Sequence, residues 1–140
     1  MTDIVKKRIL NAEQKSRFLP DIFDVFFPDA ENYVNHFMHQ YAKGYDGGEW
    51  EYVIMPNGAY AFIGPKGYHL SLSNYFDEFL SKEEVGIIVA LYAFSHYCCI
   101  AFDKGWDRAN ELMAQRFHAL RDYTETLPSD VQSRIFRAID

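Results

Sequence analysis

Cysteine is scarce in this chain, and the two cysteines, Cys98 and Cys99, are adjacent within an apolar run. Neighbouring residues on a helix point in different directions, so a disulfide between them is not expected. This excludes the disulfide framework of a small secreted protein and predicts two buried free thiols in a reducing compartment. The first residues lack the apolar core of a signal peptide, which also predicts a cytoplasmic protein.

The chain also lacks an excess of basic residues. It has 14 lysines and arginines against 20 aspartates and glutamates, which gives a formal net charge of -6. A DNA-binding domain usually shows the opposite balance, and a protein that imitates DNA needs a denser field of carboxylates. Acidic residues concentrate in residues 21–84. An acidic decoy that uses this segment to occupy a DNA-binding groove therefore stays open as an alternative.

Four arginines near the C-terminal end do not form a basic stripe. They are interleaved with acidic residues: Arg116, Arg121, Arg134 and Arg137. This pattern predicts a mixed, solvated surface and no strong nucleic-acid binding.

No catalytic motif is evident. Gly64-Pro65-Lys66-Gly67 lacks the spacing of a phosphate-binding loop and precedes a predicted strand. His36 and His39 lie one turn apart on a predicted helix, as metal ligands often do, but no cysteine or third histidine is near them in sequence. His96 is expected to be a core histidine. We predict no metal, no cofactor and no enzymatic activity; a small hydrolase with a metal at His36 and His39 is the alternative.

The clearest fold signal is a β-hairpin between Tyr45 and Pro65. Two runs rich in β-branched and aromatic residues flank Pro56-Asn57-Gly58, a sequence typical of a type I turn closed by a bulge. Gly47-Gly48 just before the hairpin predicts a sharp bend or a close approach of the backbone. Alternation predicts a third strand over residues 68–72 and a brief fourth strand over 76–79. Residues 1–10 suit an edge strand or a disordered start.

Helices are predicted on both sides of these strands. Asn11 is a candidate N-cap for a short helix over residues 12–18 that Pro20 ends. Asp29 is a candidate N-cap for a longer helix up to about residue 43, with Gly44 as its C-cap. Two more helices are predicted over residues 106–126 and from about Ser129 onward.

The longest helix is predicted over residues 82–102. Ser81 and Glu84 have the spacing of a capping box at its start. From Val85 to Phe102 no residue is charged, which is the length of a membrane span but equally that of a central core helix. Acids on both flanks and no adjacent basic cluster favour the core helix.

These elements predict one α+β domain over residues 1–140. Its expected architecture is a small antiparallel sheet of three to four strands packed against about four or five helices.

Four stretches carry a resemblance that extends over nearly the whole chain. They are Arg17-Phe18-Leu19-Pro20; Tyr45-Asp46-Gly47-Gly48-Glu49-Trp50 followed by Asn57-Gly58 and Tyr60; Phe117-His118-Ala119-Leu120-Arg121; and Phe136-Arg137-Ala138-Ile139-Asp140. In this order and spacing the sequence resembles the antirestriction family of ArdB and KlcA proteins. One departure is Ala59, where members of the family often have a second glycine after the turn.

The resemblance implies a non-enzymatic inhibitor of host type I restriction-modification systems, found on plasmids and other mobile elements, that protects incoming DNA. It also implies that the protein does not act as a DNA mimic. The expected partner is a type I restriction-modification complex or an associated host factor, contacted as a protein, with no membrane involved. The oligomeric state is left open.

Four residues at matching motif positions are candidates for the interaction surface. Arg17 offers a planar fork of five donors, and its alternative role is a local salt bridge. Glu31 matches the acidic residue of the family, and its alternative role is to stabilise the helix dipole. Trp50 is a candidate hot spot if exposed and a core residue if buried. Asp140 carries side-chain and terminal carboxylates, and the family ending implies that it is held in place.

Overall fold

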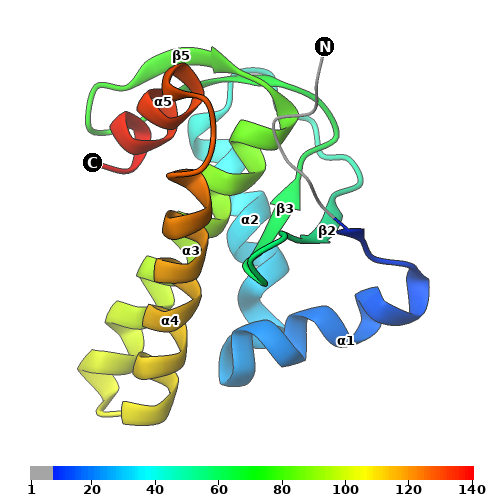
Figure 1. The fold of residues 1–140 in the computed structure, drawn as a ribbon, viewed down its shortest axis with the longest axis vertical. Coiled ribbons are helices and arrows are strands. Elements are labelled where there is room, and N and C mark those ends of the chain that lie inside the picture. The colour runs from blue at the N-terminus through cyan, green and yellow to red at the C-terminus, as the bar shows by residue number, and fades with distance from the viewer. Residues whose placement is uncertain (1–7) are drawn as a thin grey trace.

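The structure, a computed structural model, describes residues 8–140, in which a run of consecutive short strands separates an N-terminal group of helices from a C-terminal group (Figure 1). The elements are β1 (Arg8–Ile9), α1 (Ala12–Phe23), the 3-10 helix η1 (Asp24–Phe26), α2 (Phe27–Tyr41), β2 (Glu51–Ile54), β3 (Tyr60–Ile63), β4 (Tyr68–Ser71), β5 (Asp77–Leu80), α3 (Lys82–Lys104), α4 (Asp107–Thr124) and α5 (Ser129–Ile139). This confirms the predicted α+β class. The part of the predicted N-terminal edge strand in residues 1–7 lies outside the described residues.

The strands form two antiparallel sheets and not the single sheet that we predicted. One sheet has the order β1-β2-β3, and the other contains β4 and β5. The predicted hairpin is confirmed: β2 pairs with β3, and Gly58 between them has a φ of +86°. β4 does not join this sheet. The edge of β4 that is not paired with β5 is covered by the segment after α2, where Lys43 N–H donates to the His69 carbonyl over 3.0 Å.

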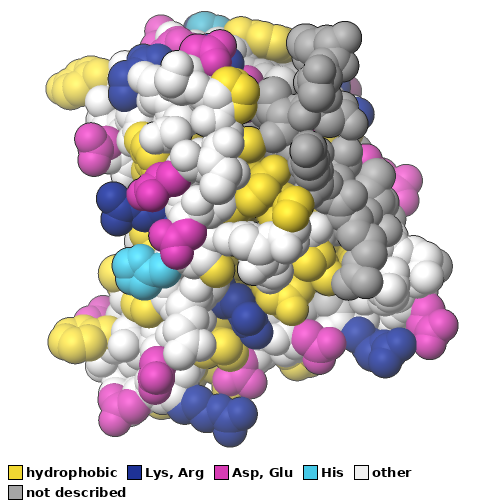
Figure 2. Space-filling model, in the orientation of Figure 1, with side chains coloured by type: hydrophobic (Ala, Val, Ile, Leu, Met, Phe, Trp, Pro, Cys, Tyr) yellow, Lys and Arg dark blue, Asp and Glu magenta, His cyan; other side chains and the backbone are white. Residues whose placement is uncertain are grey.

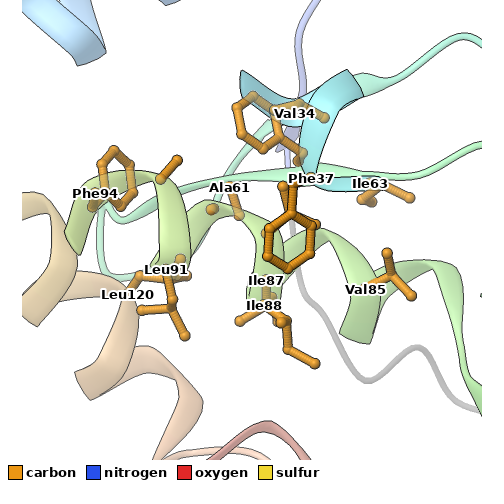
Figure 3. Packing of buried hydrophobic residues seen from close by; sticks show 14 of the residues in the cluster. Val34, Phe37, Ala61, Ile63, Val85, Ile87, Ile88, Leu91, Phe94 and Leu120 are labelled. Carbon is orange, nitrogen blue, oxygen red and sulfur yellow. The ribbon is translucent and has the colours of Figure 1, made fainter. Parts of the chain in front are cut away.

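Helix α3 is the centre of the core. Figure 3 shows its apolar side chains meeting Val34 and Phe37 of α2, Ala61 and Ile63 of β3, and Leu120 of α4. By length and composition alone α3 could cross a membrane, but 61% of its most apolar window is buried inside the protein. This is the burial expected of a core helix, and each large side chain buried here contributes about 2 kcal/mol.

A glycine sets the contact between α3 and the hairpin. A Cβ added to Gly86 would lie 1.8 Å from the carbonyl oxygen of Phe62, so only glycine lets α3 approach the backbone of β3 this closely. The capping box predicted at the start of the helix is confirmed, with Ser81 and Glu84 each accepting from the other's backbone N–H. Glu84 is also buried and accepts from Arg134 Nε of α5 over 2.7 Å, which ties the last helix to α3.

Three predicted helix boundaries were wrong. Helix α1 has the predicted N-cap, Asn11, but it runs through Pro20 to Phe23 because burial of Ile22 and Phe23 offsets the hydrogen bond that proline cannot donate. Helix α2 begins before Asp29, which lies in its first turn. Its C-cap is Ala42, two residues before the predicted glycine.

Two predictions of burial were also wrong, because the far half of α3 is buried only along the side that carries Tyr97 and Ala101. Cys98 and Cys99 are free thiols as predicted, but Cys99 is exposed and Cys98 is only partly buried. His96 is exposed and stacks on Tyr33 with ring centroids 4.8 Å apart, so it is not a core histidine.

Candidate functional site

A cleft of about 460 Å³ lies between α1, α2 and the start of β2. Two of the four predicted interaction residues, Glu31 and Trp50, line it. The described residues that line it are Ser16, Glu31, Val34, Asn35, Gly48, Glu49, Trp50, Tyr52 and Phe62. The cleft therefore combines aromatic and aliphatic walls with two acidic side chains and one amide.

Glu31 is held at the edge of the cleft by the hairpin. The Tyr52 hydroxyl donates a hydrogen bond to Glu31 Oε1, and the Tyr52 ring stacks on Phe18 with centroids 4.7 Å apart. Burial of the ring, together with the adjacent carboxylate, raises the pKa of Tyr52 well above its usual value of 10, so the phenol stays a donor at neutral pH. Glu31 is exposed and thus presents its carboxylate to solvent in a fixed position.

Trp50 is half-buried, so it is neither fully exposed nor a core residue. Its indole N–H donates to the Tyr45 hydroxyl over 3.0 Å, and that hydroxyl donates to Asn35 Oδ1 over 2.9 Å. The indole ring also packs against Phe62 in an edge-to-face arrangement, with centroids 6.4 Å apart. The N–H edge of Trp50 is fixed by this relay, and the side chain lines the cleft.

The loop before β2 supplies the cleft's outer rim. Gly47 and Gly48 have φ values of +94° and +129°, in the region that favours glycine. A Cβ on Gly48 would lie 2.8 Å from Pro65, so the loop also passes close to the end of the hairpin. Of the two alternatives predicted for the glycine pair, a sharp bend or a close approach of the backbone, the close approach is present.

Arg17 does not face this cleft. Its guanidinium contacts Glu13 Oε1 at 3.1 Å within α1, and the side chain is 66% exposed. It lines a smaller hollow of about 250 Å³, together with Phe18, Asp21 and Tyr60 among others. Its geometry is that of the local salt bridge that the sequence left as an alternative.

Asp140 lies in a third place, beside the turn between β4 and β5. Asn74 Nδ2 donates to the backbone oxygens of Arg137, Ala138 and Asp140 over 3.1, 3.0 and 3.3 Å. The Tyr92 hydroxyl also donates to the Ala138 oxygen over 2.6 Å. The end of α5 is therefore held, and Figure 1 places it on the opposite side of the molecule from α1.

The histidines do not assemble into a metal centre. His36 and His39 are both exposed, and within residues 8–140 no group of three or more His, Cys, Asp or Glu side chains has metal-binding geometry. The residues that sequence reasoning missed are Asn35, Tyr45 and Tyr52. Tyr52 acts through a partner 21 residues away, and Tyr45 joins Trp50 to Asn35 of the preceding helix, so helix or strand periodicity could not have identified these contacts.

Each of the four C-terminal arginines contacts another part of the chain. Arg134 contacts Glu84, and Arg137 contacts Glu78. Arg116 donates to the Asp21 carbonyl over 3.3 Å, and Arg121 lies over the Phe136 ring. Figure 2 shows acidic and basic side chains interspersed over one face, with no continuous field of either sign.

Comparisons with known proteins agree with this architecture. Residues 43–140 match the family described as antirestriction protein. YubI of Escherichia coli (strain K12), named as an antirestriction protein, is 29% identical over 136 residues, covering 94% of each chain. The uncharacterised protein YfjX of the same strain is 29% identical over 136 residues, covering 91% of this chain and 83% of YfjX.

A solved structure is similar over the whole chain. It covers 100% of this chain and 98% of its own, with a TM-score of 0.80 and 25% identity. It is described as showing that the KlcA and ArdB proteins have a novel fold and antirestriction activity against type I DNA restriction systems in vivo but not in vitro. Since the family match extends over more than half of the sequence, this chain belongs to the antirestriction protein family.

Proposed function

We propose that the protein inhibits host type I restriction-modification systems in the cytoplasm and so protects incoming plasmid or mobile-element DNA. The observation that carries the proposal is the whole-chain similarity to the KlcA and ArdB structure, whose description reports antirestriction activity against type I systems in vivo. The inhibitor acts by contact with a protein and catalyses no reaction.

The state of the acidic residues supports contact over DNA mimicry. A mimic needs free carboxylates spaced like phosphates, but five acids in the segment considered for that role have partners within the chain. They are Asp29 with Tyr97, Glu31 with Tyr52, Asp77 with His69, Glu78 with Arg137, and Glu84 with Arg134. Arg137 and Arg134 offset the charges of Glu78 and Glu84, which weakens the field of this segment, and salt screens the remaining field within about 10 Å.

The cleft around Glu31 and Trp50 is the proposed contact site. It offers a half-buried tryptophan, a residue type enriched at interface hot spots, and a fixed carboxylate at the edge of a preformed hollow. Arg17 and Asp140 face other sides of the molecule. We propose them as separate contacts and not as parts of this cleft.

The partner is a type I restriction-modification complex or a host factor associated with it. Activity of the similar proteins in vivo but not in vitro favours a factor that is present only in the cell. Purified type I enzyme should then cleave DNA equally well with and without the protein. An acidic decoy predicts the opposite result, namely inhibition of the purified enzyme that weakens as salt is raised.

Plating of unmodified phage on cells with a type I system tests the site. Glu31→Ala and Trp50→Ala should reduce protection by at least about tenfold, while Glu111→Ala, an exposed acid on α4, should not. Trp50→Phe keeps an aromatic wall and guards against simple unfolding. Circular dichroism must show that each variant is folded. Full protection by both folded cleft variants would contradict the site assignment.

A further inference from the structure

The turn between β2 and β3 has a hydrogen-bond pattern that can be compared with that of a second turn in the chain. Gly58 N–H donates to the Met55 carbonyl over 2.9 Å, and Met55 N–H donates to the Ala59 carbonyl over 2.8 Å. Asn57 Oδ1 accepts from Ala59 N–H over 3.0 Å. The last turn residue, Gly58, has a φ of +86°, which glycine adopts without steric cost.

The turn between β4 and β5 has the same hydrogen bonds. Tyr75 N–H donates to the Leu72 carbonyl over 3.1 Å, and Leu72 N–H donates to the Phe76 carbonyl over 2.8 Å. Asn74 Oδ1 accepts from Phe76 N–H over 3.1 Å. Tyr75 has a φ of +71° and therefore occupies the position that Gly58 occupies in the first turn.

A tyrosine in this position costs free energy that its side chain does not recover by packing. Bulky residues with a positive φ are uncommon because Cβ crowds the backbone. The Tyr75 side chain is 96% exposed, so burial does not offset this strain. The other non-glycine residue with a positive φ in residues 8–140, Asp24, is half-buried and of a short polar type that tolerates such backbones better.

The turn that presents Tyr75 is firmly held. The Asn74 side chain bonds the carbonyls at the end of α5, and the Phe76 ring is buried with the Arg137 guanidinium 5.7 Å from its centroid. Figure 1 shows this turn lying against α5. A partner that binds Tyr75 therefore has little backbone entropy to remove.

A second exposed aromatic lies on the adjoining strand. Phe79 of β5 is 67% exposed. Asp77 lies between the two rings in sequence, is also exposed, and contacts His69 of β4. Alternation along the strand places Phe79 and Asp77 on one face of the ribbon, the face that points away from the core.

We propose that Tyr75, with Phe79, is a contact surface for a protein that offers an apolar socket for the phenol ring. This rests on the proposed function, which requires a protein partner, and it adds a contact surface away from the cleft. Strained residues that the fold does not need occur at functional positions. Tyrosine is enriched at interface hot spots because a rigid ring buries much area and its hydroxyl still finds a partner.

The surroundings favour a protein over a nucleic acid. Arg137, which lies over the neighbouring Phe76 ring, is paired with Glu78, and Arg134 is paired with Glu84. Lys43 is close enough to Asp77 to interact with its carboxylate, so the negative charge of Asp77 offsets the positive charge of Lys43. Among the residues that the structure describes, a phosphate backbone would therefore meet no cluster of available cations around Tyr75.

The test is the variant Tyr75→Gly, assayed for stability and for protection. Relief of strain should leave the melting temperature unchanged or raise it by a few degrees. Protection of unmodified phage in cells with a type I system should fall at least about tenfold. Tyr75→Phe should keep most of the protection, and Phe102→Ala, at an exposed aromatic on α3, should keep all of it.

The outcomes separate this inference from the proposed function. If the wild type gives no protection, the proposed function itself fails. If the wild type protects and Tyr75→Gly protects equally, or if Tyr75→Gly lowers the melting temperature, the inference is overturned. Two further findings would also overturn it: binding of a labelled DNA duplex that depends on Tyr75, or self-association that depends on Tyr75 in sedimentation.

Discussion

The indole N–H of Trp50 donates a 3.0 Å hydrogen bond to the hydroxyl of Tyr45, and this bond joins the start of β2 to the segment that follows α2. Tyr45 is buried and passes the interaction on to Asn35 of α2. The wall of the cleft is therefore shaped by one hydroxyl that acts as acceptor and donor at once.

Tyr45→Phe should lower the free energy of unfolding by about 1–2 kcal/mol, because it leaves a donor and an acceptor unpaired in a partly buried place. Urea denaturation monitored by tryptophan fluorescence measures this change. Tyr75→Phe removes the same atom from a side chain in solvent and should change stability by less than about 0.5 kcal/mol. Equal effects of the two substitutions would contradict the relay.

Gly86→Ala should prevent stable folding or cost about 3 kcal/mol or more, because the new methyl group would overlap the Phe62 carbonyl and push α3 away from β3. Thermal unfolding followed by circular dichroism gives the result. The matched control is Gly44→Ala, where no atom lies within 4 Å of the new Cβ but φ is +74°. It should cost about 1 kcal/mol. A well-folded Gly86→Ala protein of wild-type stability would be inconsistent with the packing described.

The pair of His69 and Asp77 predicts an acid-sensitive contribution to stability. A hydrogen bond with His69, together with the charges of His69 and Lys43, lowers the pKa of Asp77 below its usual 3.8. Because the folded pKa is the lower one, the pair stabilises the fold above about pH 4 and loses this contribution as the pH falls through the folded pKa. His69→Asn should move the Asp77 midpoint back toward the usual value, as measured by NMR of the side-chain carboxyl. An unchanged midpoint would refute the assignment.

Asn74→Ala should loosen the end of α5, since one side-chain amide bonds three backbone oxygens there. Hydrogen exchange of the last turn of α5 should become faster, while exchange in the middle of α3 stays unchanged. Ser73→Ala, in the same turn, removes a long 3.4 Å contact with Tyr41 and should have little effect. If exchange at the helix end does not respond to Asn74→Ala, the turn does not hold this part of the chain.

Local sequence patterns correctly predicted the elements that are determined by interactions between residues close in sequence. Pro56-Asn57-Gly58 and the pair of Ser81 and Glu84 predicted the hairpin and the start of α3, because turn and capping chemistry act over three or four residues. The helix end predicted at Pro20 was wrong because the cause is not local. Burial of the residues that follow Pro20 stabilises a helix that a proline alone would end.

The candidate site was only partly predictable. Glu31 and Trp50 were selected separately and share one cleft, but the residues that position them act through tertiary contacts. Tyr52 reaches Glu31 from a position 21 residues away. The division of the strands into two sheets was also missed, because it depends on Lys43 occupying the edge of β4. The alternation of apolar and polar residues along a strand shows which face is buried, but it does not show which strand lies beside it.

We propose that this protein blocks type I restriction inside the cell by contact with a protein. The most direct measurement is the plating efficiency of unmodified phage on cells with a type I system, with and without expression of the wild-type chain. We predict a rise of at least about tenfold on expression, and no change in matched cells that lack the restriction system. An unchanged plating efficiency in the restricting cells, with the folded protein present, would contradict the account.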